Sequence, residues 1–220
     1  MKNTQNLTII TVVVVAAILL AAIIIPRLGG TSTQVASGDF AYASQPIAGS
    51  PDAPVKVALF FDFLCPHCAD FGETVTPILK REFVDTGVAA IYFYNFPVID
   101  ATISRSLGMV GECVLQQSNE AFLTIEPVLL RSRATLASLG TNSAITARAV
   151  SLALDYAPNL DSGTLNTCVS ESQTAAAVEA DVALARALNL GGTPSVLVNG
   201  QLVSNPTLEN IRRAIQAAAG

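Results

Sequence analysis

The apolar and polar positions change their pattern several times along the chain, and each change predicts a different element. Residues Leu7–Ile25 contain no charge, Gly or Pro. As a helix rising about 1.5 Å per residue they would extend about 28 Å, close to the hydrocarbon thickness of a bilayer. Pro26 and Arg27 follow the run, and the nearest Ala-x-Ala, Ala41–Ala43, lies well downstream. The pattern favours one uncleaved transmembrane helix, an anchor over residues 1–28, rather than a cleaved signal peptide.

The following stretch, 29–54, is rich in Gly, Ser, Thr, Ala and Gln. This composition is typical of a flexible linker. The alternative is an N-terminal arm that packs on the domain, because Phe40, Tyr42 and Ile47 could dock there. Both interpretations stay open.

A strand–helix–strand unit comes next. Val55–Phe63 is a dense apolar run with only two charged residues, which predicts a buried central strand. A helical pattern follows over Pro66–Val84, and Pro77 should interrupt it. Val88–Phe96, rich in aromatic and β-branched residues, predicts a second strand. Together these elements predict a βαβ unit with a right-handed crossover.

The segment 99–189 is rich in Ala, Leu, Ser, Glu and Arg and poor in aromatic residues. Several helices fit it, with breaks near Gly140, Pro158 and Gly163. We interpret it as a helical insertion.

Strand signals return at Ser195–Val198. Asn199-Gly200 is a strong two-residue hairpin turn, and Gln201–Val203 would be the returning strand. Asn205 is then typical of a helix N-cap, with Pro206 at the first helical position. The final helix carries an apolar stripe formed by Leu208, Ile211 and Ile215.

The order βαβ unit, helical insert, hairpin and helix predicts an α/β protein. It is the skeleton of a thioredoxin-like fold with an inserted helical domain, preceded by one transmembrane helix. The core would comprise residues 55–98 and 190–220, and the insertion 99–189.

Composition excludes several classes of protein. Of the 220 residues 51 % are apolar and 13 % are charged, which excludes an intrinsically disordered chain. Twelve Lys and Arg against seventeen Asp and Glu give a net charge of −5, and this acidity argues against a nucleic-acid partner. His67 is the single histidine, so a metal site built from several histidines is excluded.

The positions of charges and cysteines predict an orientation. Lys2 precedes the apolar run and Arg27 follows it, a weak bias for a cytoplasmic N-terminus. All four cysteines come after the run, and several cysteines in a small exported domain suit an oxidising compartment. We expect a single-pass protein of the cell membrane whose folded domain lies on the extracytoplasmic side.

The sequence Cys65-Pro66-His67-Cys68 carries the candidate chemistry. Cys65 falls where a strand ends and a helix begins, and the unpaired N–H groups there favour a thiolate and lower its pKa. Pro66 suits the first helical turn. His67 could donate a hydrogen bond or a charge to the thiolate, and Cys68, one turn along, could close a disulfide with Cys65.

Two other interpretations of the motif are possible. The pair could be half of a structural zinc site, which would require Cys113 and Cys168 as the other ligands. It could also form an inert disulfide. The βαβ context favours a redox pair.

Three segments together resemble one known family. Phe61–Cys68, Gly192–Pro194 followed by Val196–Gly200, and Asn95–Pro97 are similar to motifs of the DsbA-like thiol–disulfide oxidoreductases of the thioredoxin superfamily. The resemblance implies that Pro194 is cis and packs beside Cys65 and Cys68. A cis bond there would expose the backbone of Thr193, which could pair with an extended substrate.

The chain departs from the family pattern at Leu59. Family members often carry an acidic residue six positions before the first cysteine, and here that position is Leu59. Asp62, three positions before Cys65, recurs in one branch of the family and could accept a proton near Cys68. Asp62 could equally cap the active-site helix or face solvent.

Cys113 and Cys168 both fall in the predicted insertion. The resemblance implies a structural disulfide between them, which would close a loop of about 56 residues worth roughly 4 kcal/mol on the chain-entropy model. Two buried free thiols, or a second redox pair, are the alternatives. Nearby Glu112 and Glu171 would raise a thiol pKa rather than lower it.

The resemblance implies an extracytoplasmic oxidoreductase that acts mainly as a dithiol oxidase on exported proteins with reduced cysteines. A membrane partner of the DsbB or vitamin-K-epoxide-reductase type would reoxidise it. We expect no cofactor and no metal. We also expect a monomer, because residues 29–50 leave no room for a dimerisation domain.

Two rival functions remain. A reductase or isomerase on the same fold would need the cysteine pair held reduced by an electron donor. A non-enzymatic module for metal binding or assembly would use Cys65 and Cys68 as metal ligands, which the acidic, Met-poor sequence does not favour.

Overall fold

The computed structural model describes residues 40–220. The apolar run Leu7–Ile25 and the predicted anchor over 1–28 lie outside the described residues. Among residues 40–220, no helix combines the length and the apolar character needed to cross a membrane.

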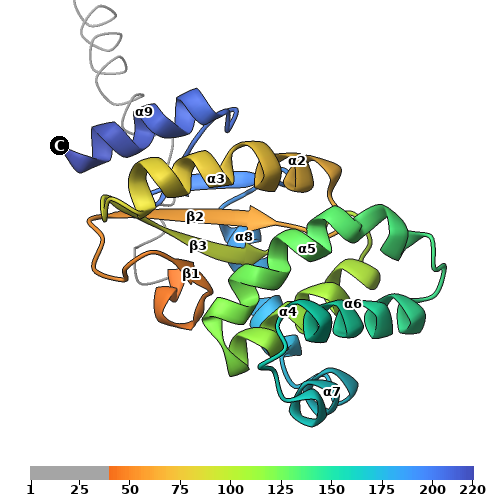
Figure 1. The fold of residues 1–220 in the computed structure, drawn as a ribbon. Helices are drawn as coiled ribbons and strands as arrows, with labels where there is room; N and C mark the ends of the chain where they lie inside the picture. The colour runs from red at the N-terminus through yellow and green to blue at the C-terminus, as the bar shows by residue number, and fades with distance from the viewer. Residues whose placement is uncertain (1–39) are drawn as a thin grey trace, which may run out of the picture. The chain divides into compact units, whose positions relative to one another are not determined.

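A five-stranded sheet forms the centre of the described chain (Figure 1). The strand order is β1-β3-β2-β4-β5, and the strands are β1 Ile47–Ala48, β2 Val55–Phe61, β3 Ala89–Asn95, β4 Ser195–Val198 and β5 Gln201–Leu202. β2 and β3 are parallel, with Val55 opposite Ala89 and Phe61 opposite Asn95, whereas the other pairs are antiparallel. The two predicted βαβ strands are confirmed, each slightly shorter than expected.

Strand β2 is buried on both faces, which explains its continuous apolar sequence. Val57, Leu59 and Phe61 pack into one hydrophobic core. Ala58 and Phe60 point the other way into a second core, where they meet β3 and helix α8, Ala175–Ala187.

Helices α2, Pro66–Thr74, and α3, Thr76–Leu79, cover the first face of the sheet, followed by a π-helical turn, Lys80–Val84. The predicted interruption by Pro77 is confirmed, since one helical stretch divides at Val75. The ring of Pro77 removes an N–H donor and disfavours a continuous helix.

Helix α9, Leu208–Ala219, lies on the same face (Figure 1) and buries Ile211 and Ile215, which confirms the apolar stripe. The predicted N-cap is wrong. Asn205 has a left-handed backbone with φ of 51°, and Thr207 caps the helix by accepting a hydrogen bond from the N–H of Asn210 at 3.3 Å.

The predicted hairpin between β4 and β5 is confirmed. Asn199 and Gly200 have φ values of 46° and 79°. A tight two-residue turn needs positive φ at both central positions, which Asn and Gly tolerate best.

The segment after β3 is helical, as predicted. Its helices are α4 Ile103–Gln117, α5 Asn119–Ala137, α6 Asn142–Tyr156, α7 Ser162–Ser170 and α8. Gly140 and Pro158 lie in breaks. Gly163 instead lies inside α7, because the side chain of Asp161 caps that helix two residues before it. A disulfide joins Cys113 of α4 to Cys168 of α7, as the resemblance implies.

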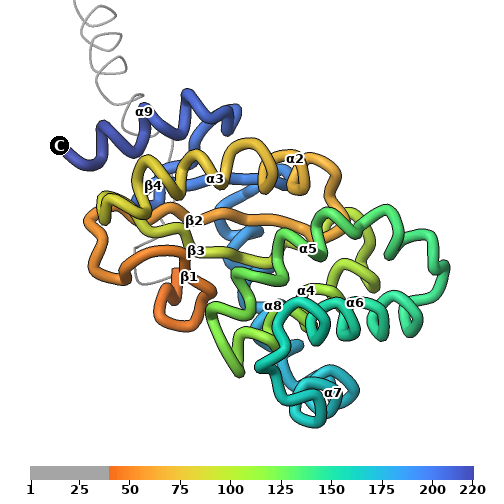
Figure 2. Tube along the Cα trace, viewed as in Figure 1, coloured from red at the N-terminus to blue at the C-terminus, as the bar shows by residue number. Residues whose placement is uncertain are grey.

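Residues 40–54 form a packed arm, so the flexible-linker interpretation is wrong for this part of 29–54. Phe40 is fully buried and its carbonyl accepts a 2.6 Å hydrogen bond from the hydroxyl of Tyr94. The ring of Phe40 stacks on Tyr42. The arm then runs antiparallel to β3 as the short strand β1 (Figure 2).

Glu126 of α5 lines a cavity of about 570 Å³ together with Lys80 and Arg131. Its side chain is buried, and no hydrogen bond or ion pair joins it to another residue of the described chain. Burial raises the pKa of Glu126 from 4.5 to about 7, although Lys80 and Arg131 oppose the shift. Between these values the folded protein holds a proton that the unfolded chain has released, so stability falls as pH rises.

We predict that Glu126→Gln removes the loss of stability that ionisation of buried Glu126 causes as pH rises. The variant should match the wild type at pH 4 and exceed its free energy of unfolding by up to roughly 3 kcal/mol at pH 8. Urea unfolding at both pH values measures the difference, with exposed Glu73→Gln from the same cavity as control. Equal destabilisation of Glu126→Gln at both pH values would contradict the prediction.

Candidate active site

The strand-to-helix junction fixes the backbone of Cys65. After β2 ends, the N–H of Cys65 donates to the carbonyl of Asp62 at 3.0 Å, which closes a turn. Cys65 is extended, with φ of −71° and ψ of 120°, as a residue before proline prefers. It is therefore the N-cap of α2, and Pro66 takes the first helical position, as expected.

Pairing between β2 and β4 brings the second half of the site to the same edge of the sheet. Phe60 lies opposite Ser195 in an antiparallel pair, so the residues after β2 meet those before β4. The Thr193–Pro194 peptide bond is cis, as the resemblance implies. The thiol of Cys65 donates to the carbonyl oxygen of Thr193 at 3.3 Å.

Cys65 and Cys68 are both free thiols and both buried. A hydrogen bond from Cys68 is the largest influence on Cys65 and lowers its pKa to about 5. Burial opposes the shift, while the side chain of Thr193 and the backbone N–H groups of Cys68 and His67 support it. The pKa of Cys68 is raised, because it shares its proton with Cys65 and is buried. When the pair loses one proton, the resulting thiolate is therefore on Cys65.

The hydroxyl of Thr193 is buried and makes no hydrogen bond with the described chain. A buried hydroxyl without a partner is costly. It is available to donate to a sulfur that becomes charged, which agrees with its lowering effect on the pKa of both cysteines.

His67 acts differently from the sequence-based expectation. Its side chain is exposed and makes no hydrogen bond within residues 40–220, and its backbone N–H is one of several groups that lower the pKa of Cys65. The first turn of a helix points its unpaired N–H groups toward the N-cap, so any non-proline residue at this position supplies that donor.

Asp62 neither faces solvent nor caps α2. It is 2 % exposed, and its Oδ1 accepts the N–H of Leu64 at 2.8 Å. Its Oδ2 accepts the N–H groups of Val98 at 2.8 Å and Ile99 at 2.9 Å. Leu59 is a buried core residue of β2. Because leucine does not ionise, this position lacks the acidic group that the family often carries there.

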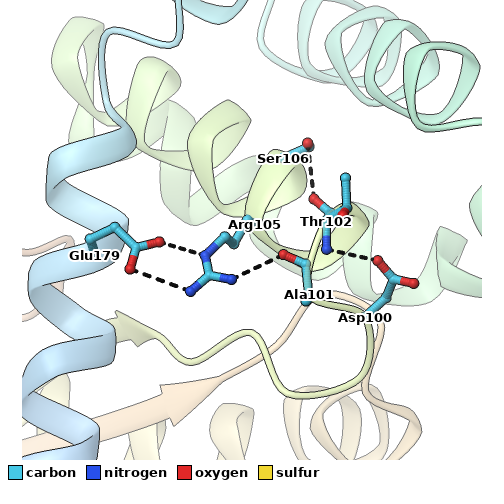
Figure 3. Close-up of polar contacts among 6 residues, drawn as sticks. All are labelled: Asp100, Ala101, Thr102, Arg105, Ser106 and Glu179. Atoms are coloured by element: carbon cyan, nitrogen blue, oxygen red, sulfur yellow. Dashed lines mark hydrogen bonds and ion pairs between the residues drawn. The ribbon is translucent and has the colours of Figure 1, made fainter.

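Sequence reasoning missed the loop after β3 that Asp62 holds. Its far end is anchored where Asp100 accepts the N–H groups of Thr102 and Ile103. Arg105 of α4 bonds both the carbonyl of Ala101 and the carboxylate of Glu179 on α8 (Figure 3). Asp100 just before the helix was the available signal, since Asp often precedes a first helical turn.

The zinc site with four cysteine ligands is wrong for this chain. Its second pair of ligands would be Cys113 and Cys168, whose sulfurs are bonded to each other. Both are buried between α4 and α7.

A family model described as Thioredoxin matches residues 42–217. The probable disulfide bond formation protein D of Bacillus anthracis is 33 % identical over 178 residues, which cover 80 % of this chain and 79 % of that protein. The chain belongs to the DsbA-like thiol–disulfide oxidoreductases of the thioredoxin family. Disulfide bond formation protein D of Bacillus subtilis is 25 % identical over 169 residues, covering 77 % of this oxidoreductase and 74 % of that protein.

Solved structures show the same fold. Oxidised BdbD from Bacillus subtilis superposes on this oxidoreductase with a TM-score of 0.71 at 24 % identity, covering 81 % of this chain and 95 % of that chain. DsbA from Chlamydia trachomatis gives a TM-score of 0.69 at 23 % identity, covering 79 % and 90 %. The thioredoxin-like fold with a helical insertion is therefore confirmed.

We predict that alkylation of Cys65 in the reduced oxidoreductase rises with pH around a midpoint near 5, the pKa that its hydrogen bonds produce. Cys68→Ala removes the largest of these contacts and should move the midpoint upward. His67→Ala keeps the backbone N–H and should move it less. Iodoacetamide labelling followed by mass spectrometry measures all three, and a wild-type midpoint near the free-cysteine value of about 8.5 would contradict the assignment.

Proposed function

We propose that this oxidoreductase acts mainly as a dithiol oxidase that introduces disulfides into exported proteins. A substrate thiolate attacks Sγ of Cys65 in the oxidised enzyme, and the electron pair of the broken bond goes to Cys68. A second substrate thiolate then attacks the substrate sulfur of the mixed disulfide, and Cys65 leaves as a thiolate. The substrate gains one disulfide, and the enzyme keeps two electrons.

The lowered pKa of Cys65 is the observation that supports oxidation over reduction. A thiolate of low pKa is a good leaving group, and its stabilisation favours the dithiol form of the enzyme. The disulfide form is then an oxidant. Cys65, Cys68, Pro194 and Thr193 are the proposed site residues, with His67 contributing through its backbone and Pro66 by starting α2.

The cellular setting belongs to the same proposal. The apolar run Leu7–Ile25 would anchor a monomer in the cell membrane, with the catalytic domain outside the cytoplasm. There it would meet exported proteins with reduced cysteines. A membrane partner of the DsbB or vitamin-K-epoxide-reductase type would remove the two electrons, so no bound cofactor or metal is required.

We predict that the oxidised full-length chain transfers disulfides to reduced, unfolded ribonuclease. Loss of ribonuclease thiols, followed by mass tagging, measures the transfer. Cys65→Ala and Cys68→Ala should each abolish it, because each removes one sulfur of the exchanging disulfide.

The control is the double variant Cys113→Ala, Cys168→Ala, which should retain transfer while folded, because that disulfide is buried in the insertion. The proposal fails if the oxidised protein leaves ribonuclease reduced while its dithiol form rapidly reduces insulin. That result would identify a reductase.

A further inference from the structure

Asp62 joins two segments that the sheet itself leaves unconnected. The ladder of β2 and β3 continues to the N–H of Phe96, which donates to the carbonyl of Phe61 at 2.7 Å. Beyond Phe96 the segments that follow β2 and β3 separate, one into the cysteine motif and the other into the 97–99 loop. The Asp62 carboxylate spans this gap, with Oδ1 on the motif side and Oδ2 on the loop side.

All three donors to this carboxylate are backbone N–H groups, from Leu64, Val98 and Ile99. The carboxylate is buried, and three of its roughly four acceptor positions hold backbone N–H groups. A group in that position is poorly placed to take a proton from Cys68. The contacts therefore favour a positioning role over the proton-acceptor role that the sequence left open.

The main chain of Asp62 acts on both cysteines of the motif. Its carbonyl accepts the N–H of Cys65 in the turn before α2. The backbone of Asp62 also lowers the pKa of Cys68 and so opposes the effect of burial on that sulfur. The side chain of Asp62 thus fixes a turn whose backbone meets both cysteines.

We propose that Asp62 is a positioning residue for disulfide exchange at Cys65–Cys68. This inference deepens the proposed function and rests on it for the identity of the reacting pair. When a thiolate attacks Cys65, the new S–S bond forms on Cys65 and the Cys65–Cys68 bond breaks. The electron pair passes to Cys68, where the backbone of Asp62, held in place by the carboxylate, favours the thiolate.

The other end of the loop, at the start of α4, is also held by hydrogen bonds. Asp100 and Arg105 hold the start of α4, and Arg105 connects it to Glu179 of α8 (Figure 3). Loss of the Asp62 hydrogen bonds would therefore separate the cysteine motif from the loop, while the loop itself stays attached to α4.

The test is the rate at which reduced glutathione opens the Cys65–Cys68 disulfide in the oxidised full-length chain, followed by mass tagging of the released thiol. Asp62→Asn keeps the shape but cannot accept on both sides. Asp62→Ser keeps a local acceptor for Leu64 and loses the two bonds to the loop. Both variants should react about tenfold more slowly, the effect expected for losing a hydrogen-bond set around a charge.

The slowing should be the same at pH 6 and pH 8, because Asp62 transfers no proton. Asp70→Asn, an exposed carboxylate two residues after Cys68, is the matched control and should react as the wild type does. Rates within about twofold of the wild type, a loss at one pH only, or equal slowing by Asp70→Asn would each overturn the proposal.

Amide hydrogen exchange of the unaltered chain provides a test that needs no variant. The N–H groups of Val98 and Ile99 lie outside helices and strands, and they should nevertheless exchange slowly. Rapid exchange would overturn the proposal even if the variants fail to fold. Glutathione exchange reports the disulfide chemistry alone, so these results stand apart from whether the protein oxidises or reduces its substrates.

Discussion

Two buried sulfur atoms must share one proton, and the site is organised around that constraint. Burial alone would raise the pKa of both thiols, because it disfavours the charged form. For Cys65 the surrounding donors reverse this effect, and for Cys68 burial and the shared proton prevail. In the proposed exchange, this asymmetry assigns Cys65 as the attacked and leaving sulfur and Cys68 as the internal partner. An exchange reaction needs this difference between two chemically identical side chains.

The fold supplies those donors by bringing the ends of separate elements together. The close of β2 leads into the first turn of α2, whose N–H groups face Cys65, and the start of β4 brings Thr193 across from it. Because β2 packs between two hydrophobic cores, its end is fixed from both faces. Helices α4 and α8 of the insertion then hold the loop after β3 through Arg105 and Glu179. Rigid positioning of this kind limits reorganisation during reaction.

The parts of the fold predictable from sequence are those that local chemistry decides. The run from Val55, the interruption by Pro77 and the Asn199-Gly200 turn each have one strongly favoured conformation, and each is present. Cys65 as N-cap followed from the proline after it. The end of the chain was less predictable, since both Asn205 and Thr207 can cap a helix and the left-handed backbone at Asn205 gave the position to Thr207.

Contacts between distant residues could not be read from the sequence. The side chain of Asp62 reaches Val98 and Ile99, which are far along the chain, and no local pattern records that meeting. The docking of Phe40 on Tyr94 was likewise one of two options until the sheet placed them together. His67 is the single histidine, yet the contact that links it to Cys65 comes from its backbone N–H.

The reduction potential of the Cys65–Cys68 pair tests the central claim most directly. The full-length chain would be equilibrated with glutathione buffers, and the thiols counted by mass tagging, since the chain has no Trp to report the change. A stabilised Cys65 thiolate predicts a potential well above the value of about −270 mV typical of thioredoxin. A potential at or below that value would show that the thiolate is not stabilised enough to make this enzyme an oxidase.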